Sequence, residues 1–219
     1  MIEFESLIEL RDGWYWPKSD TRCWAYMQAY PDLPFEIAKF VPDKQVMIQA
    51  GGNCGFYPKK YASIFREVYT FEPEWLNFYC LSRNITEPNV IKSQACLGDV
   101  PKLVDLSVNE KNRGKTHISG TGKYPVYLID NLGLDTCNLI HLDIEGYEYF
   151  ALLGAVNTIK KCSPVVVVEM WDQLDNRFGE NLNQKTEQLL TSLNYKFVET
   201  LHDSDKVFVH ENLYNKIKK

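Results

Sequence analysis

The sequence predicts an α/β fold in which a mostly parallel, doubly wound sheet carries helices on both faces. Three observations predict it. From about residue 45, short apolar segments alternate with segments of helical character. These apolar segments are nearly continuous, as in 164–170, which indicates strands buried on both faces. The first apolar segment runs directly into glycine-rich residues 51–55, where a backbone without Cβ atoms can approach a ligand closely.

The elements follow from this alternation. We expect seven strands, at 46–50, 68–71, 89–95, 138–142, 164–170, 195–199 and 206–209. We expect helices near 57–66, 74–84, 146–161 and 183–193. The last two strands are separated by the turn-like residues 202–205, so they should form an antiparallel hairpin at the sheet edge.

Two segments depart from the alternation. Residues 1–42 form an aromatic-rich N-terminal cap, which either packs as a lid over apolar surface or offers a platform for sugars. Residues 100–124 are polar and interrupt the strand–helix rhythm, as functional loops and lids do. The remaining chain, 43–219, is long enough for one α/β domain with its own core.

Composition limits the function classes. The net charge of −5 argues against non-specific binding to nucleic acid or to a membrane surface. The six cysteines contain no CxxC pair, which suits a reducing compartment better than a disulfide framework or a zinc site. The acidic first residues are unlike a secretory signal, and no apolar run approaches the ~18 residues of a membrane span. We therefore expect a cytoplasmic protein.

In open α/β sheets, ligands bind outside the carboxyl ends of the strands. Residues 51–55 occupy this position after the first strand, and Glu72 ends the second, 23 residues after Gln49. A carboxylate placed there can accept two hydrogen bonds from a ribose diol. The segment is neither a G-x-G-x-x-G fingerprint nor a P-loop, which favours a nucleoside cofactor without phosphates, such as S-adenosylmethionine.

Five successive segments together resemble the motifs of FkbM-type methyltransferases. They are Gln49–Gly55 (QAGGNCG), Phe71–Pro73 (FEP), Ala95–Asp99 (ACLGD), Leu142–Glu148 (LDIEGYE) and Val167–Glu169 (VVE). Asn84 and residues 152–155 also match, so the likeness covers roughly residues 45–170. The resemblance implies a class I S-adenosylmethionine methyltransferase fold with a seven-stranded sheet and an antiparallel edge strand. It also implies O-methylation, with S-adenosylhomocysteine as the product of the cofactor.

The resemblance assigns cofactor roles to individual positions. Gly51, Asn53 and Gly55 would contact the methionine end of the cofactor, and Glu72 would bind the ribose hydroxyls. Asp99 would lie near the adenine, and Asp143 would face the sulfonium and the acceptor.

Gln49 is a departure, because the family usually has an acid at this cofactor-binding position. An amide can still accept a hydrogen bond but brings no charge toward the cofactor's ammonium. We expect weaker cofactor binding, or compensation from Glu72 or Asp143.

A hydroxyl acceptor must lose its proton as it attacks the methyl group. Asp143, at the end of a strand beside the cofactor, is the preferred base or positioning group, with His117 in the 100–124 loop as another candidate. Glu145 fits the acidic first turn of a helix, and His141 fits a core position.

Glu169 is a further catalytic candidate, because it ends a strand that should neighbour the one ending at Asp143. The two acids could hold Mg²⁺, but two carboxylates are few for such a site, so no metal is favoured.

These observations favour methyl transfer to a hydroxyl of a small molecule or carbohydrate. One alternative is a non-catalytic subunit that binds S-adenosylmethionine, which the uncharged Gln49 would suit. The other is an NAD-dependent oxidoreductase, and the absent phosphate-binding fingerprint counts against it.

Overall fold

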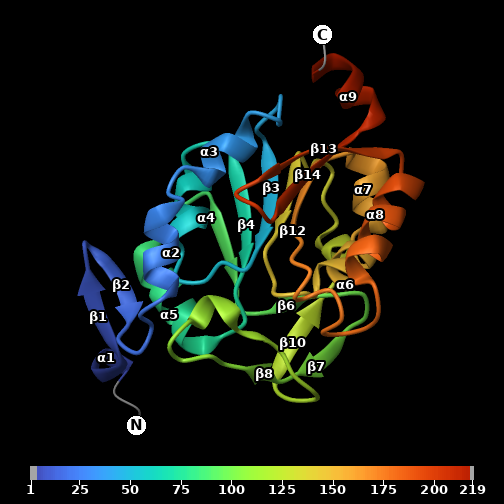
Figure 1. Ribbon diagram of the computed structural model, residues 1–219. Coiled ribbons are helices and arrows are strands. Elements are labelled where there is room, and N and C mark those ends of the chain that lie inside the picture. Colours follow the sequence, from blue (N-terminus) through green and yellow to red (C-terminus); the bar gives the residue numbers. More distant parts are fainter. Residues whose placement is uncertain (1–3, 218–219) are drawn as a thin grey trace.

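A computed structural model describes residues 4–217 of the chain. Its centre is a seven-stranded sheet with helices packed on both faces (Figure 1). The strand order is β13 (Tyr195–Leu201), β14 (Asp205–His210), β12 (Val165–Glu169), β11 (Leu139–Leu142), β3 (Val46–Ala50), β4 (Glu67–Phe71) and β5 (Val90–Ser93). The predicted class I fold is therefore confirmed.

Five neighbouring strands of this sheet, from β12 to β5, run parallel. The β13–β14 hairpin forms the edge, as predicted, and β14 pairs antiparallel with both β12 and β13. All parallel strands consequently end at the same edge of the sheet, and the segments that follow them meet there.

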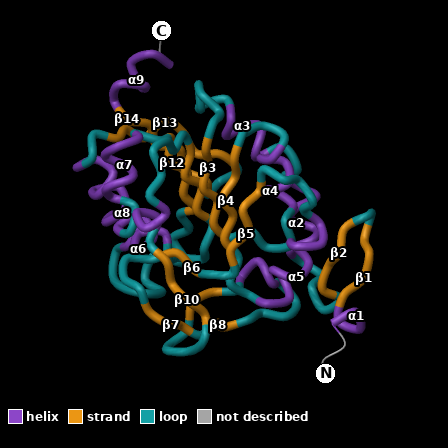
Figure 2. The backbone as a smooth tube through the Cα atoms, turned by 180° about the vertical axis from the view of Figure 1, so that it is seen from behind, coloured by secondary structure: helices purple, strands orange, loops and turns teal. Residues whose placement is uncertain are grey.

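Alternate residues of each central strand pack into two separate cores. On one face, residues such as Met47 and Leu139 pack against α2 (Cys23–Ala29), α3 (Leu33–Ala38), α4 (Phe56–Ala62) and α5 (Trp75–Asn84). On the other, Ile48 and Ile140 pack against α6 (Glu148–Leu153), α7 (Val156–Cys162) and α8 (Leu182–Ser192). Figure 2 shows these two helical layers from behind. This burial on both faces explains why the strands are continuously apolar.

The predicted helix 146–161 is divided into α6 and α7 at Gly154. A Cβ atom at Gly154 would lie 2.0 Å from the backbone oxygen of Gly98, so the chain passes too close here for any side chain. The predicted strand 89–95 is shortened to β5, and Cys96–Leu97 forms β6 in a second sheet with β10 (Tyr124–Tyr127) and β7 (Lys102–Val104).

The N-terminal segment contains α1 (Phe4–Leu7) and a hairpin of β1 (Ile8–Arg11) and β2 (Trp14–Pro17), followed by α2 and α3. Its aromatic side chains mostly pack: Trp16 is fully buried, with its ring 5.0 Å from Trp24, and Trp14 lies 5.1 Å from Phe56. Of the six aromatic residues between 14 and 30, Tyr26 lines the large cavity described below. Most of this cluster thus hides apolar surface.

Residues 100–124 contain β7, β8 (Leu106–Ser107), the 3₁₀ turn η1 (Arg113–Lys115) and β9 (His117–Ile118). The C-terminal part of the described chain is α9 (Glu211–Ile217). Among residues 4–217, no helix combines the length and the apolar character that crossing a bilayer requires.

Candidate functional site

Four carboxylate side chains lie in one row across the carboxyl edge of the sheet: Glu72, Asp143, Glu169 and Asp205. Register pairs Phe71 with Ala50, Ala50 with Leu142, and Leu142 with Val168 on successive parallel strands. The next residues of these strands are Glu72, Gly51, Asp143 and Glu169, and Glu169 pairs in turn with Asp205 of β14. Since neighbouring strands lie about 4.8 Å apart, the row places acids on both sides of Gly51.

The turn after β3 requires glycine at its first position. Gly51 has φ +85°, and a Cβ atom there would lie 1.9 Å from the backbone oxygen of Asp143. The N–H groups of Gly51 and Gly52 donate to the carbonyl of Phe71 at 3.1 and 2.9 Å. The turn thus continues the sheet pairing while keeping the space above it clear.

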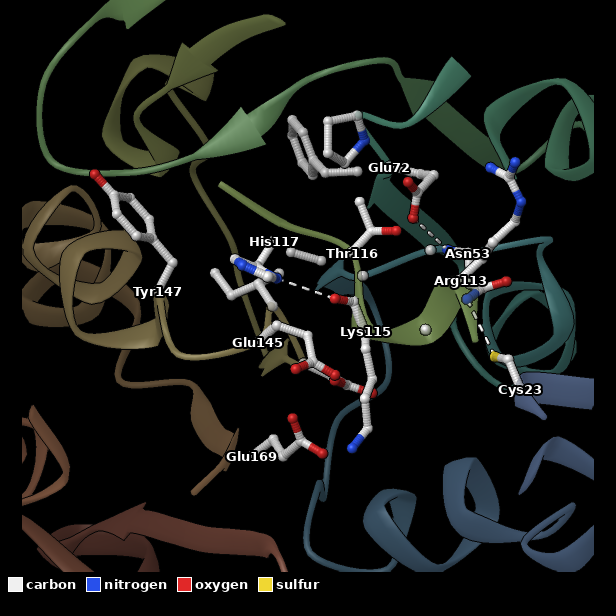
Figure 3. A pocket seen from close by; sticks show the side chains of 18 of the residues that line it. Cys23, Asn53, Glu72, Arg113, Lys115, Thr116, His117, Glu145, Tyr147 and Glu169 are labelled. Carbon is white, nitrogen blue, oxygen red and sulfur yellow. Dashed lines mark hydrogen bonds between the residues drawn. The ribbon is translucent and has the colours of Figure 1, made fainter. Parts of the chain in front are cut away.

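Glu72 is buried and held by the same turn. Its carboxylate accepts hydrogen bonds from the backbone N–H groups of Asn53 and Glu74, each at 2.8 Å (Figure 3). A carboxylate has about four acceptor sites, so about two remain, as many as a ribose diol has hydroxyls. Burial raises the pKa of Glu72 to about 8, although the backbone bonds oppose the shift.

Gln49 lies beneath the turn and is fully engaged by the protein. Its amide nitrogen donates to the carbonyl of Gly51 at 2.9 Å, and its Oε1 accepts from the Thr70 hydroxyl at 2.7 Å. It is buried and is not part of the cavity wall. The amide therefore braces the turn from below.

Asp143 and Glu169 form a carboxyl pair. They follow neighbouring strands, and Oε2 of Glu169 is a buried atom with no hydrogen-bond partner among the described residues. Burial raises the pKa of both groups well above the usual values, and for Glu169 the charge of Asp143 adds to the shift. Trp171 fixes the other oxygen of Glu169 by donating its Nε1–H to Oε1 at 2.7 Å. Both carboxyls are therefore protonated more readily than solvated acids are.

Glu145, the neighbouring acid, is neutralised by an arginine. Arg177 donates to its Oε2 at 3.2 Å and to its backbone oxygen at 2.7 Å. Burial nonetheless raises the pKa of Glu145. Glu148, the first residue of α6, holds the preceding turn by accepting hydrogen bonds from the backbone N–H groups of Ile144 and Gly146.

A cavity of about 420 Å³ opens above this row. Its wall includes the acids Glu72, Asp143, Glu145 and Glu169 and the turn residues Gly51 and Asn53. Its size lies in the range of sites that enclose a ligand the size of a nucleoside cofactor. Figure 3 shows labelled side chains from several elements around this space.

Residues 112–118 of the insertion form part of the cavity wall. Arg113 anchors this segment: its Nη1 donates to Oε2 of Glu74 at 2.8 Å, and both side chains are almost entirely buried. Glu74 also caps α5 by accepting from the N–H groups of Leu76 and Asn77. The insertion is therefore attached to the element that carries Glu72.

Three further residues were predicted at the cofactor or catalytic site, and only one of them lines the cavity. His117 lines the cavity, where its Nδ1 lies 3.1 Å from the carbonyl of Lys115. Asp99 and Gly55 lie outside the cavity wall: Asp99 is 3.8 Å from the ammonium of Lys102, and Gly55 begins α4 with φ +92°. Their roles toward a cofactor remain predictions.

His141 is a core residue with partners on both ring nitrogens. Its Nδ1 lies 2.9 Å from the Tyr61 hydroxyl, and its Nε2 lies 3.4 Å from Oδ1 of Asp205. It is buried beneath the acid row, which agrees with the structural role expected for it.

Sequence reasoning missed several residues of the cavity wall. They are Arg22 and Cys23 of the N-terminal segment, Arg113, Lys115 and Thr116 of the insertion, and Tyr147 and Trp171. A signal existed for the insertion, since residues 111–115 carry three basic residues within a polar loop. No local pattern marks Arg22 or Trp171.

The described chain offers no ready metal site: residues 4–217 contain no group of three or more His, Cys, Asp or Glu side chains arranged to hold an ion. The structure therefore lends no support to the Mg²⁺ alternative.

Comparison with known proteins supports the fold and the resemblance. Residues 109–197 match the family model described as "Methyltransferase FkbM domain". No curated protein sequence matches the chain.

Solved structures include similar chains. Methyltransferase FkbM from Methylobacillus flagellatus KT is 18% identical with a TM-score of 0.52, over 77% of this chain and 44% of that one. Precorrin-6y C5,15-methyltransferase from Geobacter metallireducens GS-15 is 10% identical with a TM-score of 0.49, over 81% and 87%. Magnesium protoporphyrin IX methyltransferase from Synechocystis PCC 6803, with bound SAM, is 9% identical with a TM-score of 0.46, over 85% and 80%.

The fold and the glycine-lined edge define a class I methyltransferase fold. Within that class, the family match confirms the resemblance to FkbM-type methyltransferases. The chain spans less than half the length of the Methylobacillus FkbM structure.

Proposed function

We propose that this protein is an S-adenosylmethionine-dependent methyltransferase that methylates a hydroxyl group of a small molecule or carbohydrate. The observation that carries the proposal is the buried Glu72 carboxylate. It is locked to the glycine turn by the N–H of Asn53 and faces a cavity of about 420 Å³. These features fit an adenosyl cofactor, because the turn leaves room for it and Glu72 retains acceptor sites for the ribose.

The cofactor would supply an activated methyl group, so the protein's task is to hold the acceptor in line and to accept its proton. Gly51 and Asn53 would hold the methionine end, and Glu72 the ribose.

The Asp143–Glu169 pair is the proposed proton acceptor. It lies beside Gly51, on the side of the row away from Glu72. An acceptor hydroxyl would donate to an ionised carboxylate of the pair, and that carboxylate would take its proton as the methyl group is transferred. Burial raises the pKa values of the pair, which makes it a better base than a solvated carboxylate.

The acceptor side of the cavity supports a hydroxylated ligand. Trp171 and Tyr147 line the wall there, and Trp171 holds Glu169 in place. A flat aromatic face beside carboxylate acceptors suits a sugar or a similar polar molecule. We also propose that the insertion, residues 100–124, acts as a lid over this space and that residues 1–42 complete its wall.

Calorimetry tests the cofactor. We expect S-adenosylhomocysteine to bind one site per chain and NAD not to bind. Binding of NAD in preference would overturn the proposal in favour of an oxidoreductase.

Methyl transfer tests the reaction. The protein is incubated with S-adenosylmethionine carrying a labelled methyl group and with a panel of methyl glycosides and small alcohols. We expect labelled ether products, and Asp143→Asn should abolish them while S-adenosylhomocysteine still binds. Tight cofactor binding without transfer to any acceptor would favour the non-catalytic alternative.

A further inference from the structure

The charged groups in the cavity wall are nearly all paired within the protein. Glu145 is bound by Arg177, and Oε1 of Glu169 by Trp171. Glu72 accepts two backbone N–H groups, and the guanidinium of Arg113 is bound to Glu74.

Two cations in the wall differ from the rest. Arg22 and Lys115 both line the cavity, and among residues 4–217 neither side chain forms an ion pair or a hydrogen bond, although the charge of Lys115 acts to lower the pKa of Glu145. Arg22 comes from the N-terminal cap, and Lys115 from the insertion, within the residues that the family model matches.

Backbone contacts hold these two cations near one another. The N–H groups of Thr21 and Arg22 donate to the carbonyl of Lys111 at 3.1 and 3.2 Å. Cys23, the residue after Arg22, packs on Gly114, the residue before Lys115. A Cβ atom at Gly114 would lie 3.0 Å from the sulfur of Cys23. The two segments are therefore joined directly beside both side chains.

The same contact lies against the glycine turn. The amide nitrogen of Asn53 donates to the sulfur of Cys23 at 3.3 Å. Figure 3 shows Lys115, which also lines the cavity, extending its ammonium toward the side of Glu169. Asn53 is the residue expected to contact the cofactor's amino-acid portion, so the contact between the two segments lies beside that part of the cavity.

A carboxylate in this cavity needs such a cationic position. The carboxylates of the row, which lie on neighbouring strands, repel an anion placed over them when they are ionised. The cofactor's sulfonium and ammonium suit that row, but its α-carboxylate does not. Arg22 and Lys115 are cations of the wall that form no ion pair within residues 4–217, so they can supply the complementary charge.

We propose that Arg22 and Lys115 together bind the α-carboxylate of the cofactor, an inference that rests on the proposed use of S-adenosylmethionine. The N-terminal cap and the insertion then complete the cofactor site, each contributing one cation. We call this pair of side chains the clamp. For both cations to reach one carboxylate, the N-terminal cap and the insertion must lie close together beside Asn53.

The test compares ligands with and without the carboxylate by calorimetry. S-adenosylhomocysteine carries the whole amino-acid portion, whereas 5′-methylthioadenosine lacks it and decarboxylated S-adenosylmethionine lacks only the carboxylate. We expect Arg22→Gln and Lys115→Met each to weaken binding of S-adenosylhomocysteine about tenfold. Binding of the other two ligands should change less than about twofold, because neither offers an anion to the clamp.

Lys111→Met is the matched control. It removes a cation from the same loop at a residue outside the cavity wall, and the affinity for S-adenosylhomocysteine should not change. Circular dichroism of each variant checks that the fold is retained.

Unchanged affinity for S-adenosylhomocysteine in the Arg22 and Lys115 variants would overturn the clamp. Equal losses for S-adenosylhomocysteine and 5′-methylthioadenosine would overturn it too, since the effect would then not depend on the carboxylate. A wild-type protein that binds none of the three ligands contradicts the proposed function itself, so the two failures are distinguishable.

Discussion

Glu72 should make nucleoside binding strongly dependent on pH. Burial raises its pKa from 4.5 to about 8, so much of this carboxyl is protonated in the free protein at neutral pH. A ribose diol donates hydrogen bonds, which only the ionised carboxylate can accept at both oxygens while it also holds Asn53 and Glu74. Nucleoside binding should therefore be lost as the pH falls through the pKa of Glu72.

The magnitude follows from the fraction ionised. Two pH units below the pKa, roughly one carboxyl in a hundred is ionised, so the affinity at pH 6 should be about a hundredfold below that above pH 9. Between these limits the apparent dissociation constant should change about tenfold per pH unit.

The assay is calorimetry with 5′-methylthioadenosine from pH 6 to pH 9.5. This ligand has no ammonium or carboxylate, so it leaves Arg22, Lys115 and the acid row out of the measurement. The Glu72→Gln variant should bind weakly at every pH, because the amide mimics the neutral carboxyl. Glu148, whose pKa burial also raises to about 8, titrates in the same range, so this variant is needed to assign the slope.

Two results would refute this reasoning. One is an affinity that stays constant across the pH range in the wild-type protein. The other is a Glu72→Gln variant that keeps the wild-type slope, since another group would then control binding. Glu199→Gln, at an exposed position of β13, should behave as the wild type does.

Three further predictions concern the scaffold, each measured as the free energy of unfolding in urea. Arg113→Met leaves the buried carboxylate of Glu74 without its cation and should lower the free energy of unfolding by about 3 kcal/mol. Gly51→Ala places a Cβ atom against a backbone oxygen at 1.9 Å and should cost more than about 3 kcal/mol, whereas Gly120→Ala, also at positive φ but in open space, should cost about 1–2 kcal/mol. Tyr61→Phe removes a hydrogen bond to the buried histidine of β11 and should cost about 1–2 kcal/mol.

Matched variants separate these effects from general loss of stability. Lys111→Met and Tyr127→Phe alter exposed residues and should change the free energy of unfolding by less than about 0.5 kcal/mol. A cost for Arg113→Met no larger than that for Lys111→Met would contradict the anchoring role of the buried ion pair.

Much of the sheet was predictable because strand patterning is local. Each central strand is short, apolar and followed by a polar or glycine residue, so its position and burial follow from its own sequence. The broken helix at Gly154 was not predictable in the same way. Its cause is the close approach of Gly98, more than fifty residues away in the chain, and helical periodicity carries no information about such a contact.

The candidate site likewise has one part that local sequence predicts and another part that depends on contacts between distant residues. The sequence identified Glu72, Asp143 and Glu169, because acids at the ends of parallel strands meet at one edge. It could not reveal that Oε1 of Glu169 accepts a hydrogen bond from Trp171 while its Oε2 is buried without a partner among the described residues.

By itself, the sequence determined the parallel sheet, the glycine turn and the acids at the strand ends, since all of these depend on residues that are neighbours in the chain. The tertiary structure alone decided that Gln49 braces the turn, that Arg113 fastens the insertion to Glu74, and that Arg22 and Lys115 face one cavity. The physical reason is that pairing of charges and hydrogen-bonding groups depends on distances in space, and the chain order of residues 22, 53 and 115 does not fix those distances.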